Sequence, residues 1–493
     1  MTAVTNKMKQ ISTIVLVLIL FILTSCGQTK ADNETYTRID SYLSELEKVG
    51  FNGAVLVCLD GDIIVSKGYG FSNIEKQINN SSVTIFDIGS ITKQFTATAI
   101  LKLEMQSKLS TEDKLSKYFA HIPKDKESIT IHDLLRHQSG LISNVGGDYE
   151  KISDEEFLKK VFSSKLQFEA GKAFSYSNVG YSLLAMIIEK VSGQEYEAYL
   201  YDVLWKPAKM EMTGYSRPNF DTNLIAVGYD RNDSVWGKPT EKDWNNTSPY
   251  WHLKGNGGVL STIEDLHKWD AALKSDLILS KEAKQKLYHP KLRDDESENS
   301  IYGYGWDVSR TDRATTQVWH NGTNRIFYAD FLRYIDENVT LIMLTNKSHP
   351  NFENLCFDIS KMIFHPTYQP EIPTPDNSKN RNFTNLILRT VDDFGLEKAK
   401  AAFNKRDENV NLLEFMMRDA GFDHIDNNQP NVAMLIFEMN VYAYPKSAKA
   451  LQGLGEGYME TGNKEMALKY FKQSLRINPY SDFVNEMVKE LEK

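Results

Sequence analysis

The sequence of 493 residues is poor in cysteine and has no excess of basic charge. Its three cysteines, Cys26, Cys58 and Cys356, do not make a disulfide framework, and no spacing of cysteine and histidine indicates a structural zinc site. The formal net charge is −9, and no long run of lysine and arginine offers a surface for nucleic acid. We therefore predict no metal, no cofactor and no nucleic-acid partner. With 41% hydrophobic and 25% charged residues, the composition favours two or three globular domains.

The N-terminal hydrophobic run, Ile11 to Leu23, is too short to span a bilayer comfortably, because a spanning helix needs about 20 apolar residues. Two lysines precede this run, and it ends in the tetrapeptide LTSC, whose last residue is Cys26. The segment resembles a bacterial lipoprotein signal peptide. The resemblance implies loss of residues 1–25, lipid attachment at Cys26 and a polar tether over 26–34, with the folded domains outside the cytoplasm, in the periplasm or at the cell surface. The alternative is a plain secretory signal with a chance cysteine.

Hydrophobic periodicity predicts an α+β domain over residues 35–365. One face of 35–50 is apolar at helical spacing, and Asp60-Gly61-Asp62 separates two apolar runs as a hairpin signal. The segment 129–273 indicates mainly helices with long loops. The expected strands are 54–59, 63–69, 316–320, 325–334 and 339–344, followed by a helix over 351–364. Strands at both ends predict an antiparallel sheet that is flanked by helices and a helical lobe.

Cys58 lies within the apolar stretch GAVLVCLD, so we expect a buried thiol in a strand. An exported protein would also permit one bridge between Cys58 and Cys356. The sequence leaves that pairing open.

The C-terminal part differs in character from the domain before it. His365 to Ser378 is proline-rich and polar, which predicts a linker, placed at 366–380, before an all-α region over 381–493. In that region small and aromatic residues recur every 34 positions, a period that resembles the tetratricopeptide repeat. An unrelated amphipathic bundle is the alternative. The matched pairs are Gly421 and Gly455, Ala433 and Ala467, Phe437 and Phe471, and Pro445 and Pro479.

The stretch FDIGSITKQF contains the only Ser-x-x-Lys of the chain, Ser90 to Lys93. On a helix, residues three apart share a face, so the Lys93 amine could approach the Ser90 hydroxyl and act as its base. A serine at a helix start is also an ordinary N-cap. The motif alone leaves both interpretations open.

Two further segments carry polar side chains, one just before an expected helix and one at the end of an expected strand. Tyr176 and Asn178 form Tyr-x-Asn directly before an apolar helix, and His320-Asn321-Gly322 ends one strand and turns toward the next. Taken singly, each residue has a structural explanation, since Tyr176 could pack, Asn178 could cap the helix and His320 could be solvated.

Together and in this order, these motifs resemble the serine β-lactamase and penicillin-binding protein superfamily, especially its class C and esterase-like branch. Three more stretches support the resemblance: ITIHDLLRHQSGL, GNGGVLSTIEDLHKW and YGYGW. The resemblance covers about residues 35–365 and implies a β-lactamase/transpeptidase-like fold. It also implies a serine hydrolase that acts through an acyl-enzyme.

The resemblance assigns a role to each motif residue. Ser90 is the nucleophile, Lys93 keeps a positive charge near it or accepts its proton, and Tyr176 shares the general base work, which requires that nearby cations lower its pKa. Asn178 orients Lys93 and the substrate amide. The backbone N–H groups at Ser90 and at Thr323, just after Gly322, form the oxyanion hole.

One residue departs from the pattern of the family. Classical members carry Lys-Thr-Gly on this strand, whereas His320 stands here at the lysine position. A histidine with the reference pKa of about 6.5 is mostly neutral at pH 7, so it offers no permanent cation to a substrate carboxylate. We therefore expect a small-molecule or peptide ester or amide as substrate. A true β-lactamase or D-alanyl-D-alanine carboxypeptidase is the first alternative, and an inactive platform that binds a protein partner through its repeats is the second.

Overall fold

The structure is a computed structural model that describes residues 34–217, 219, 221–231, 233–242, 244, 248–289 and 300–492. The predicted signal peptide and Cys26 lie outside the described residues. Within them, the chain divides into two compact units, of which the first comprises 34–43 and Phe51–Ile363 and the second comprises Ser44–Gly50 and the residues from Phe364 onward. None of the described helices has the length and apolar character needed to cross a membrane.

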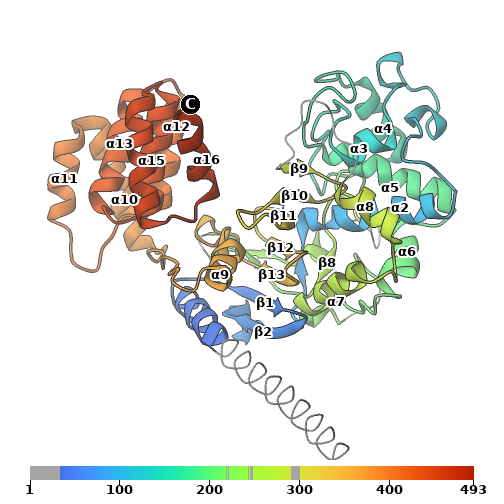
Figure 1. Cartoon of the computed structure of the whole chain (residues 1–493), viewed down its shortest axis with the longest axis horizontal. Coiled ribbons are helices and arrows are strands. Elements are labelled where there is room, and N and C mark those ends of the chain that lie inside the picture. The colour runs from blue at the N-terminus through green and yellow to red at the C-terminus, as the bar shows by residue number, and fades with distance from the viewer. Residues whose placement is uncertain are drawn as a thin grey trace, which may run out of the picture. The chain divides into compact units, whose positions relative to one another are not determined.

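An antiparallel sheet forms the centre of the first unit (Figure 1). The apolar runs β1, β12 and β13 form its middle, where nearly every residue is buried. The strands in spatial order are β2 (Asp62–Tyr69), β1 (Gly53–Leu59), β13 (Val339–Thr345), β12 (Tyr328–Tyr334), β11 (Thr316–Thr323), β10 (Asp307–Arg310) and β9 (Ser300–Tyr302). Strand β1 pairs with β13 from Gly53↔Thr345 to Leu59↔Val339. The two ends of the unit therefore meet inside one sheet, which confirms the predicted α+β fold.

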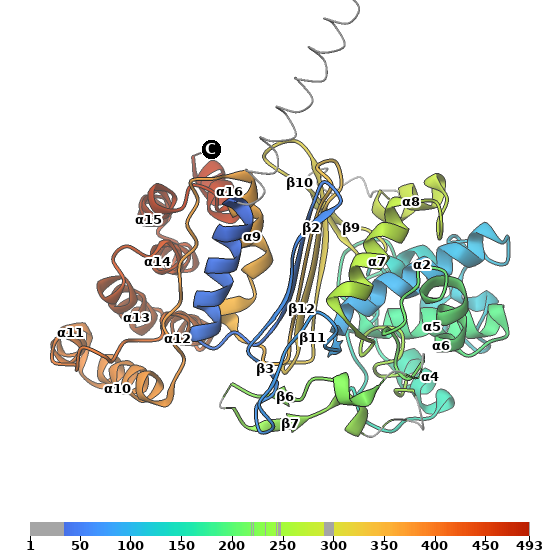
Figure 2. The same cartoon turned by 90° about the horizontal axis from the view of Figure 1, so that it is seen from below.

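Helices cover both faces of this sheet (Figure 2). The helix over residues 34–48 and α9 (Leu355–Phe364) lie on one face, where Arg38 donates to the carbonyl of Met362. The lobe on the other face contains α2 (Thr92–Met105), α3 (Ile131–Leu135), α4 (Asp154–Ser163), α5 (Asn178–Ser192), α6 (Tyr196–Leu200), α7 (Ile263–Lys274) and α8 (Lys281–Tyr288). Most of the buried hydrophobic core lies between this lobe and the sheet.

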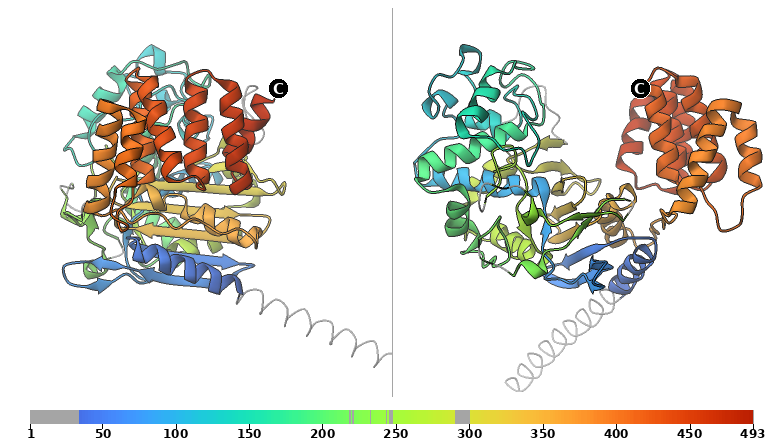
Figure 3. Two further views of the ribbon diagram at one scale, coloured as in Figure 1. Left: turned by 90° about the vertical axis from the view of Figure 1, so that its left-hand side faces the viewer. Right: turned by 180° about the vertical axis from the view of Figure 1, so that it is seen from behind.

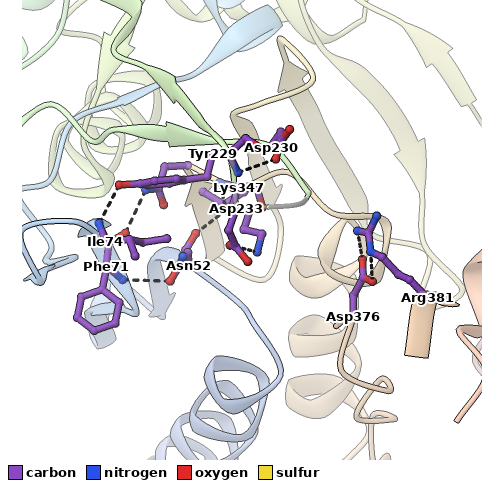
Figure 4. A network of polar contacts seen from close by, with 12 residues as sticks. Asn52, Phe71, Ile74, Tyr229, Asp230, Asp233, Lys347, Asp376 and Arg381 are labelled. Carbon is purple, nitrogen blue, oxygen red and sulfur yellow. Dashed lines mark hydrogen bonds and ion pairs between the residues drawn. The ribbon is translucent and has the colours of Figure 1, made fainter. Parts of the chain in front are cut away.

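Short strands join the lobe to the sheet. They are β3 (Phe71–Asn73) with β4 (Ile78–Asn79), β5 (Phe86–Asp87) with β8 (Leu260–Ser261), and β6 (Gly228–Tyr229) with β7 (Val235–Gly237). Polar contacts fix this region (Figure 4): the Tyr229 hydroxyl accepts a hydrogen bond from the Ile74 N–H at 2.8 Å, and Lys347 forms an ion pair with Asp233.

Two expected element boundaries are wrong for a local reason. The strand expected at 325–334 begins only at Tyr328, because Arg325 has a positive φ of 72° and the Asn324 side chain accepts the N–H groups of Ile326 and Phe327 in a turn. The helix expected from residue 351 begins at Leu355, after a short 3-10 turn. Cys58 and Cys356 are both buried free thiols.

The second unit is a series of antiparallel helices (Figure 3). They are α10 (Ser378–Phe394), α11 (Leu396–Asn404), α12 (Glu414–Asp426), α13 (Pro430–Ala443), α14 (Ala448–Glu460), α15 (Lys464–Ile477) and α16 (Asp482–Leu491). Arg381 and Asp376 form an ion pair at its start (Figure 4).

The 34-residue period places the same residue types at equivalent positions of two successive helix pairs. Gly421 on α12 and Gly455 on α14 lie against Phe437 on α13 and Phe471 on α15, and a Cβ atom on either glycine would come within 2.7 Å of the ring. The missing side chains therefore let the paired helices approach each other. Assignment to the tetratricopeptide family stays a prediction.

We predict that the first unit folds without the repeats. A chain that ends at Thr374 retains every strand of the central sheet and α9, so it should give soluble protein with a single cooperative thermal transition. Circular dichroism of this chain and of the full-length protein is the measurement. Insoluble protein or a broad, non-cooperative transition would show that the second unit is needed to complete the first.

Candidate active site

Ser90 lies in a 3-10 turn, Gly89–Ile91, that leads directly into α2. Neither the turn nor α2 has a capping side chain, so Ser90 is not an N-cap. Its hydroxyl instead lies 2.9 Å from the Lys93 Nζ. The three-residue spacing thus brings the amine to the hydroxyl.

The Lys93 amine is completely buried, and this burial lowers its pKa well below the ordinary lysine value, although the nearby Asp148 carboxylate opposes the shift. Besides Ser90, the Nζ contacts Asn178 Oδ1 at 2.8 Å and the Asn256 carbonyl at 2.7 Å, both of which can only accept. An uncharged amine has two N–H bonds and one lone pair. In the uncharged form, with both protons given to these acceptors, the lone pair would face the Ser90 hydroxyl, a geometry that suits a base beside a nucleophile.

Tyr176 stacks beside this amine, with its ring centroid 4.7 Å from the Lys93 Nζ. The expectation that cations lower its pKa is wrong: burial raises the pKa of Tyr176, and hydrogen bonding to Ser90 and Tyr302 offsets only part of the shift. The physical reason is that desolvation of the buried phenol outweighs these hydrogen bonds, and the nearby Asp307 carboxylate raises the pKa further. Tyr176 is therefore a neutral proton donor at neutral pH.

Asn178 is the first residue of α5 but does not cap it. Ser177 occupies the N-cap position, and its hydroxyl accepts from the Gly180 N–H. The Asn178 side chain is left to accept from Lys93 through Oδ1 and to donate to Asn144 Oδ1 at 2.9 Å. Its predicted contact with Lys93 is present in the structure.

His320 is buried and neutral. Its Nδ1 lies 2.5 Å from the Asn321 carbonyl oxygen, which only accepts, so Nδ1 carries the proton and Nε2 accepts from the Tyr302 hydroxyl at 2.9 Å. Burial, reinforced by Lys93, lowers the pKa of His320 to about 3. His320 therefore supplies no cation to a substrate carboxylate at neutral pH.

Two glycines allow β11 to approach the Ser90 turn. A Cβ atom on Gly322 would lie 2.0 Å from the Ile88 carbonyl oxygen and 2.7 Å from the Ser90 nitrogen. Gly89 has a positive φ of 49°, and a Cβ atom there would lie 2.5 Å from the Thr323 nitrogen. The backbone nitrogens of Ser90 and Thr323 consequently lie on the two sides of a close backbone contact, where the oxyanion hole is expected.

A buried carboxylate secures this contact from behind. Asp87 Oδ1 accepts from the Gly89 N–H and Oδ2 from the Asn324 side chain, both at 2.8 Å. Burial raises the pKa of Asp87 to about 6, and these two hydrogen bonds oppose the shift. The Asp87–Asn324 pair thus links the Ser90 turn to the turn after β11, a link that the sequence motifs did not indicate.

The site opens into a cavity of about 340 Å³. It brings together predicted and unpredicted residues from segments far apart in the chain. Its lining consists of Ser90, Phe174, Tyr176, Tyr302, Asp307, His320, Asn321, Gly322 and Thr323. Sequence reasoning singled out YGYGW as a motif without a role for Tyr302, and it missed Phe174, Asp307 and the Asn256 carbonyl. No cluster of potential metal ligands occurs among the residues that the structure describes.

Comparison with curated proteins finds relatives that match most of the chain. Penicillin-binding protein 4* of Bacillus subtilis is 31% identical over 373 residues, which cover 72% of this chain and 82% of the relative. Protein flp of Staphylococcus aureus is 29% identical over 377 residues, with 73% of each chain covered.

Solved structures show the same fold. The octameric penicillin-binding protein homologue of Pyrococcus abyssi has a TM-score of 0.57 at 25% identity, with 72% of this chain and 81% of that chain covered. The D-amino acid amidase of Ochrobactrum anthropi has a TM-score of 0.56 at 21% identity and covers 67% of this chain and 98% of its own, which shows the fold alone. The family model "Beta-lactamase" matches residues 39–355. Because this model covers more than half of the chain, and the Ser90–Lys93 geometry agrees with it, the chain belongs to the β-lactamase family, within the serine β-lactamase and penicillin-binding protein superfamily.

Proposed function

We propose that the chain is a serine hydrolase that cleaves an ester or amide through an acyl intermediate on Ser90. The observation that carries the proposal is the fully buried Lys93 amine, whose lowered pKa and 2.9 Å distance suit removal of the Ser90 proton. Membership of a superfamily of acyl-serine enzymes supports it.

In the acylation step, Lys93 takes the Ser90 proton while Oγ attacks the substrate carbonyl carbon. The N–H groups of Ser90 and Thr323 stabilise the negative charge on the carbonyl oxygen. When the bond to the leaving group breaks, Tyr176 gives its proton to the departing oxygen or nitrogen. A phenol with a raised pKa suits this role, since it keeps its proton until the leaving group becomes basic.

Deacylation reverses these proton transfers. Tyr176, now a phenolate, takes a proton from water, and the resulting hydroxide attacks the acyl carbon. The bond to Ser90 Oγ then breaks, and Oγ regains its proton from the Lys93 ammonium. Each residue ends in its starting protonation state. Tyr176 thus acts as an acid in acylation, which suits its raised pKa, and as the expected base in deacylation.

The charge of the cavity favours uncharged or cationic substrates over carboxylates. His320 is neutral, and the lining includes no lysine or arginine. The name of the relative penicillin-binding protein 4* instead speaks for a penicillin-binding enzyme. A true β-lactamase or D-alanyl-D-alanine carboxypeptidase therefore stays the alternative within this class. An inactive platform is disfavoured because Ser90, Lys93, Tyr176 and His320 form one connected site.

We also propose that Cys26 is lipidated and holds the protein on a membrane of the cell envelope, with the catalytic unit outside the cytoplasm. The basic start, the short apolar run and LTSC support this proposal. The repeats after the linker would then present a surface to a protein partner beside the anchored enzyme.

Ser90 should be the site of covalent modification. Intact mass spectrometry after exposure to a fluorophosphonate should show one adduct on the wild type and none on Ser90→Ala. Lys93→Ala and Tyr176→Phe should each lower acylation or turnover about 10²- to 10⁴-fold, and the double variant should lose little more, because the residues act as a unit. The exposed Lys108→Ala is the matched control. An adduct that persists in Ser90→Ala would refute the assignment of the nucleophile.

Neutral esters should be better substrates than β-lactams, because the cavity provides no cation for the β-lactam carboxylate. We expect kcat/KM for 4-nitrophenyl butyrate to exceed that for nitrocefin at pH 7, with both followed by absorbance on the same preparation. Faster hydrolysis of nitrocefin would favour the β-lactamase alternative.

Cys26→Ser should change the location of the protein. One acyl chain binds membranes only marginally, with an association constant of about 10⁴ M⁻¹, whereas several chains on one cysteine should hold firmly. The wild type should stay with membranes after a high-salt wash, and Cys26→Ser should be released as an exported soluble protein or remain unprocessed. Since salt screens charges but leaves buried acyl chains in place, release of the wild type by salt would indicate electrostatic attachment instead.

A further inference from the structure

Asp307 begins β10 and lines the cavity beside the catalytic residues. Strand β10 pairs with β11 from Arg310↔Thr316 to Asp307↔Trp319. From His320 onward, β11 has no partner on this side among the described strands, so its edge is open to the cavity. Asp307 marks the point where strand pairing ends and the substrate space begins.

Among the residues that the structure describes, the Asp307 carboxylate forms no side-chain hydrogen bond or ion pair, and the side chain lines the cavity. Burial raises the pKa of Asp307 to about 7. A desolvated carboxylate without a cation is costly, and a positively charged ligand in the cavity would stabilise it.

Aromatic rings surround the same space. Phe174 is 50% exposed although it is a large apolar side chain, and its ring centroid lies 6.0 Å from that of Tyr302. The ring of Tyr176 also lies 6.0 Å from that of Tyr302, in an edge-to-face arrangement. Aromatic faces together with a carboxylate are the groups that recognise an alkylated ammonium ion.

The other charges near the site do not compete for this role. The Lys93 amine is occupied by Ser90 and two acceptors, and Arg325 is exposed and interacts with Asp148. Asp307 interacts electrostatically with Tyr176 and Tyr302. Because Tyr176 is the proposed proton donor to the leaving group and lines the same cavity, we assign Asp307 to the leaving-group side of Ser90.

We propose that Asp307, with Phe174, Tyr176 and Tyr302, binds an alkylated ammonium group on the leaving group, so that the substrates are esters or amides of amino alcohols or diamines. This inference rests on the proposed serine hydrolase function and specifies its substrate class. Asp307 supplies the countercharge, the rings supply the apolar and cation–π contacts, and Tyr176 protonates the leaving atom between this cation and the carbonyl.

The test compares two esters of the same shape. Butyrylcholine carries a quaternary ammonium group, whereas 3,3-dimethylbutyl butyrate has a carbon atom in place of that nitrogen. Release of butyrate by the full-length protein gives kcat/KM for each ester. We expect the wild type to prefer butyrylcholine by about tenfold or more. Asp307→Asn should remove about tenfold of this preference, mainly through KM for butyrylcholine, and the readout is the ratio of the two esters on the same preparation.

Two further variants separate the contributions. Phe174→Leu keeps the apolar volume but removes the ring, so it should lower the preference about two- to tenfold. Asp312→Asn removes an exposed carboxylate in the turn between β10 and β11 that forms an ion pair with Arg313, and it should leave the preference unchanged.

The outcomes distinguish the two proposals. Hydrolysis of both esters without a preference for butyrylcholine, or with a preference that survives in Asp307→Asn, would overturn the ammonium site and leave the serine hydrolase standing. Failure of the wild type to hydrolyse either ester, or any activated ester, would contradict both. Even where a variant fails to fold, the wild-type ratio of kcat/KM for butyrylcholine to that for 3,3-dimethylbutyl butyrate tests the ammonium site.

Discussion

The removal of the Lys93 amine from water is the constraint on which the candidate site depends. An isolated buried ammonium would be strongly destabilising, so the fold must either neutralise the amine or surround it with acceptors. Three separate elements provide contacts within 2.9 Å: the turn of Ser90, the start of α5 with Asn178, and the loop of Asn256. Asn256 is itself held by Ser182 through its side chain. Displacement of any one of these elements would expose the amine and restore its ordinary pKa, at which it could not act as a base at neutral pH.

The same burial links the chemistry of neighbouring groups. Desolvation raises the pKa of Tyr176, so Tyr176 keeps its proton, and a neutral His320 can accept from Tyr302. It is therefore fixed which groups around Ser90 donate a proton and which accept one. Burial shifts the pKa values of Lys93, Tyr176 and His320. These shifts set the protonation states from which the proposed acylation and deacylation steps begin.

Much of the site could be predicted from sequence, because the chemistry is carried by short motifs. Ser90 and Lys93 are three residues apart, and the helix brings them together without help from distant parts of the chain. The sheet could be predicted as well, since its strands are apolar runs bounded by turns. The pKa of Tyr176 could not be predicted, because its direction depends on burial by segments that no motif names. Phe174 and Asp307 come to line one cavity only in the fold. Asp87 and Asn324, 237 positions apart, are joined by a hydrogen bond, and Asn324 lies in the turn that shortens the expected strand.

The pairing of β1 with β13 has a consequence for biosynthesis. Gly53 is opposite Thr345, so the central sheet cannot close until nearly all of the first unit has left the ribosome. Contacts between residues so distant in sequence make folding slow, because a long loop must be ordered before the contact forms. The helices of the second unit contact mainly their neighbours along the chain, and such local structure forms quickly. The last-made part of the chain can thus be folded while the sheet is still assembling, and the apolar strands β1, β12 and β13 stay exposed to aggregation for the longest time.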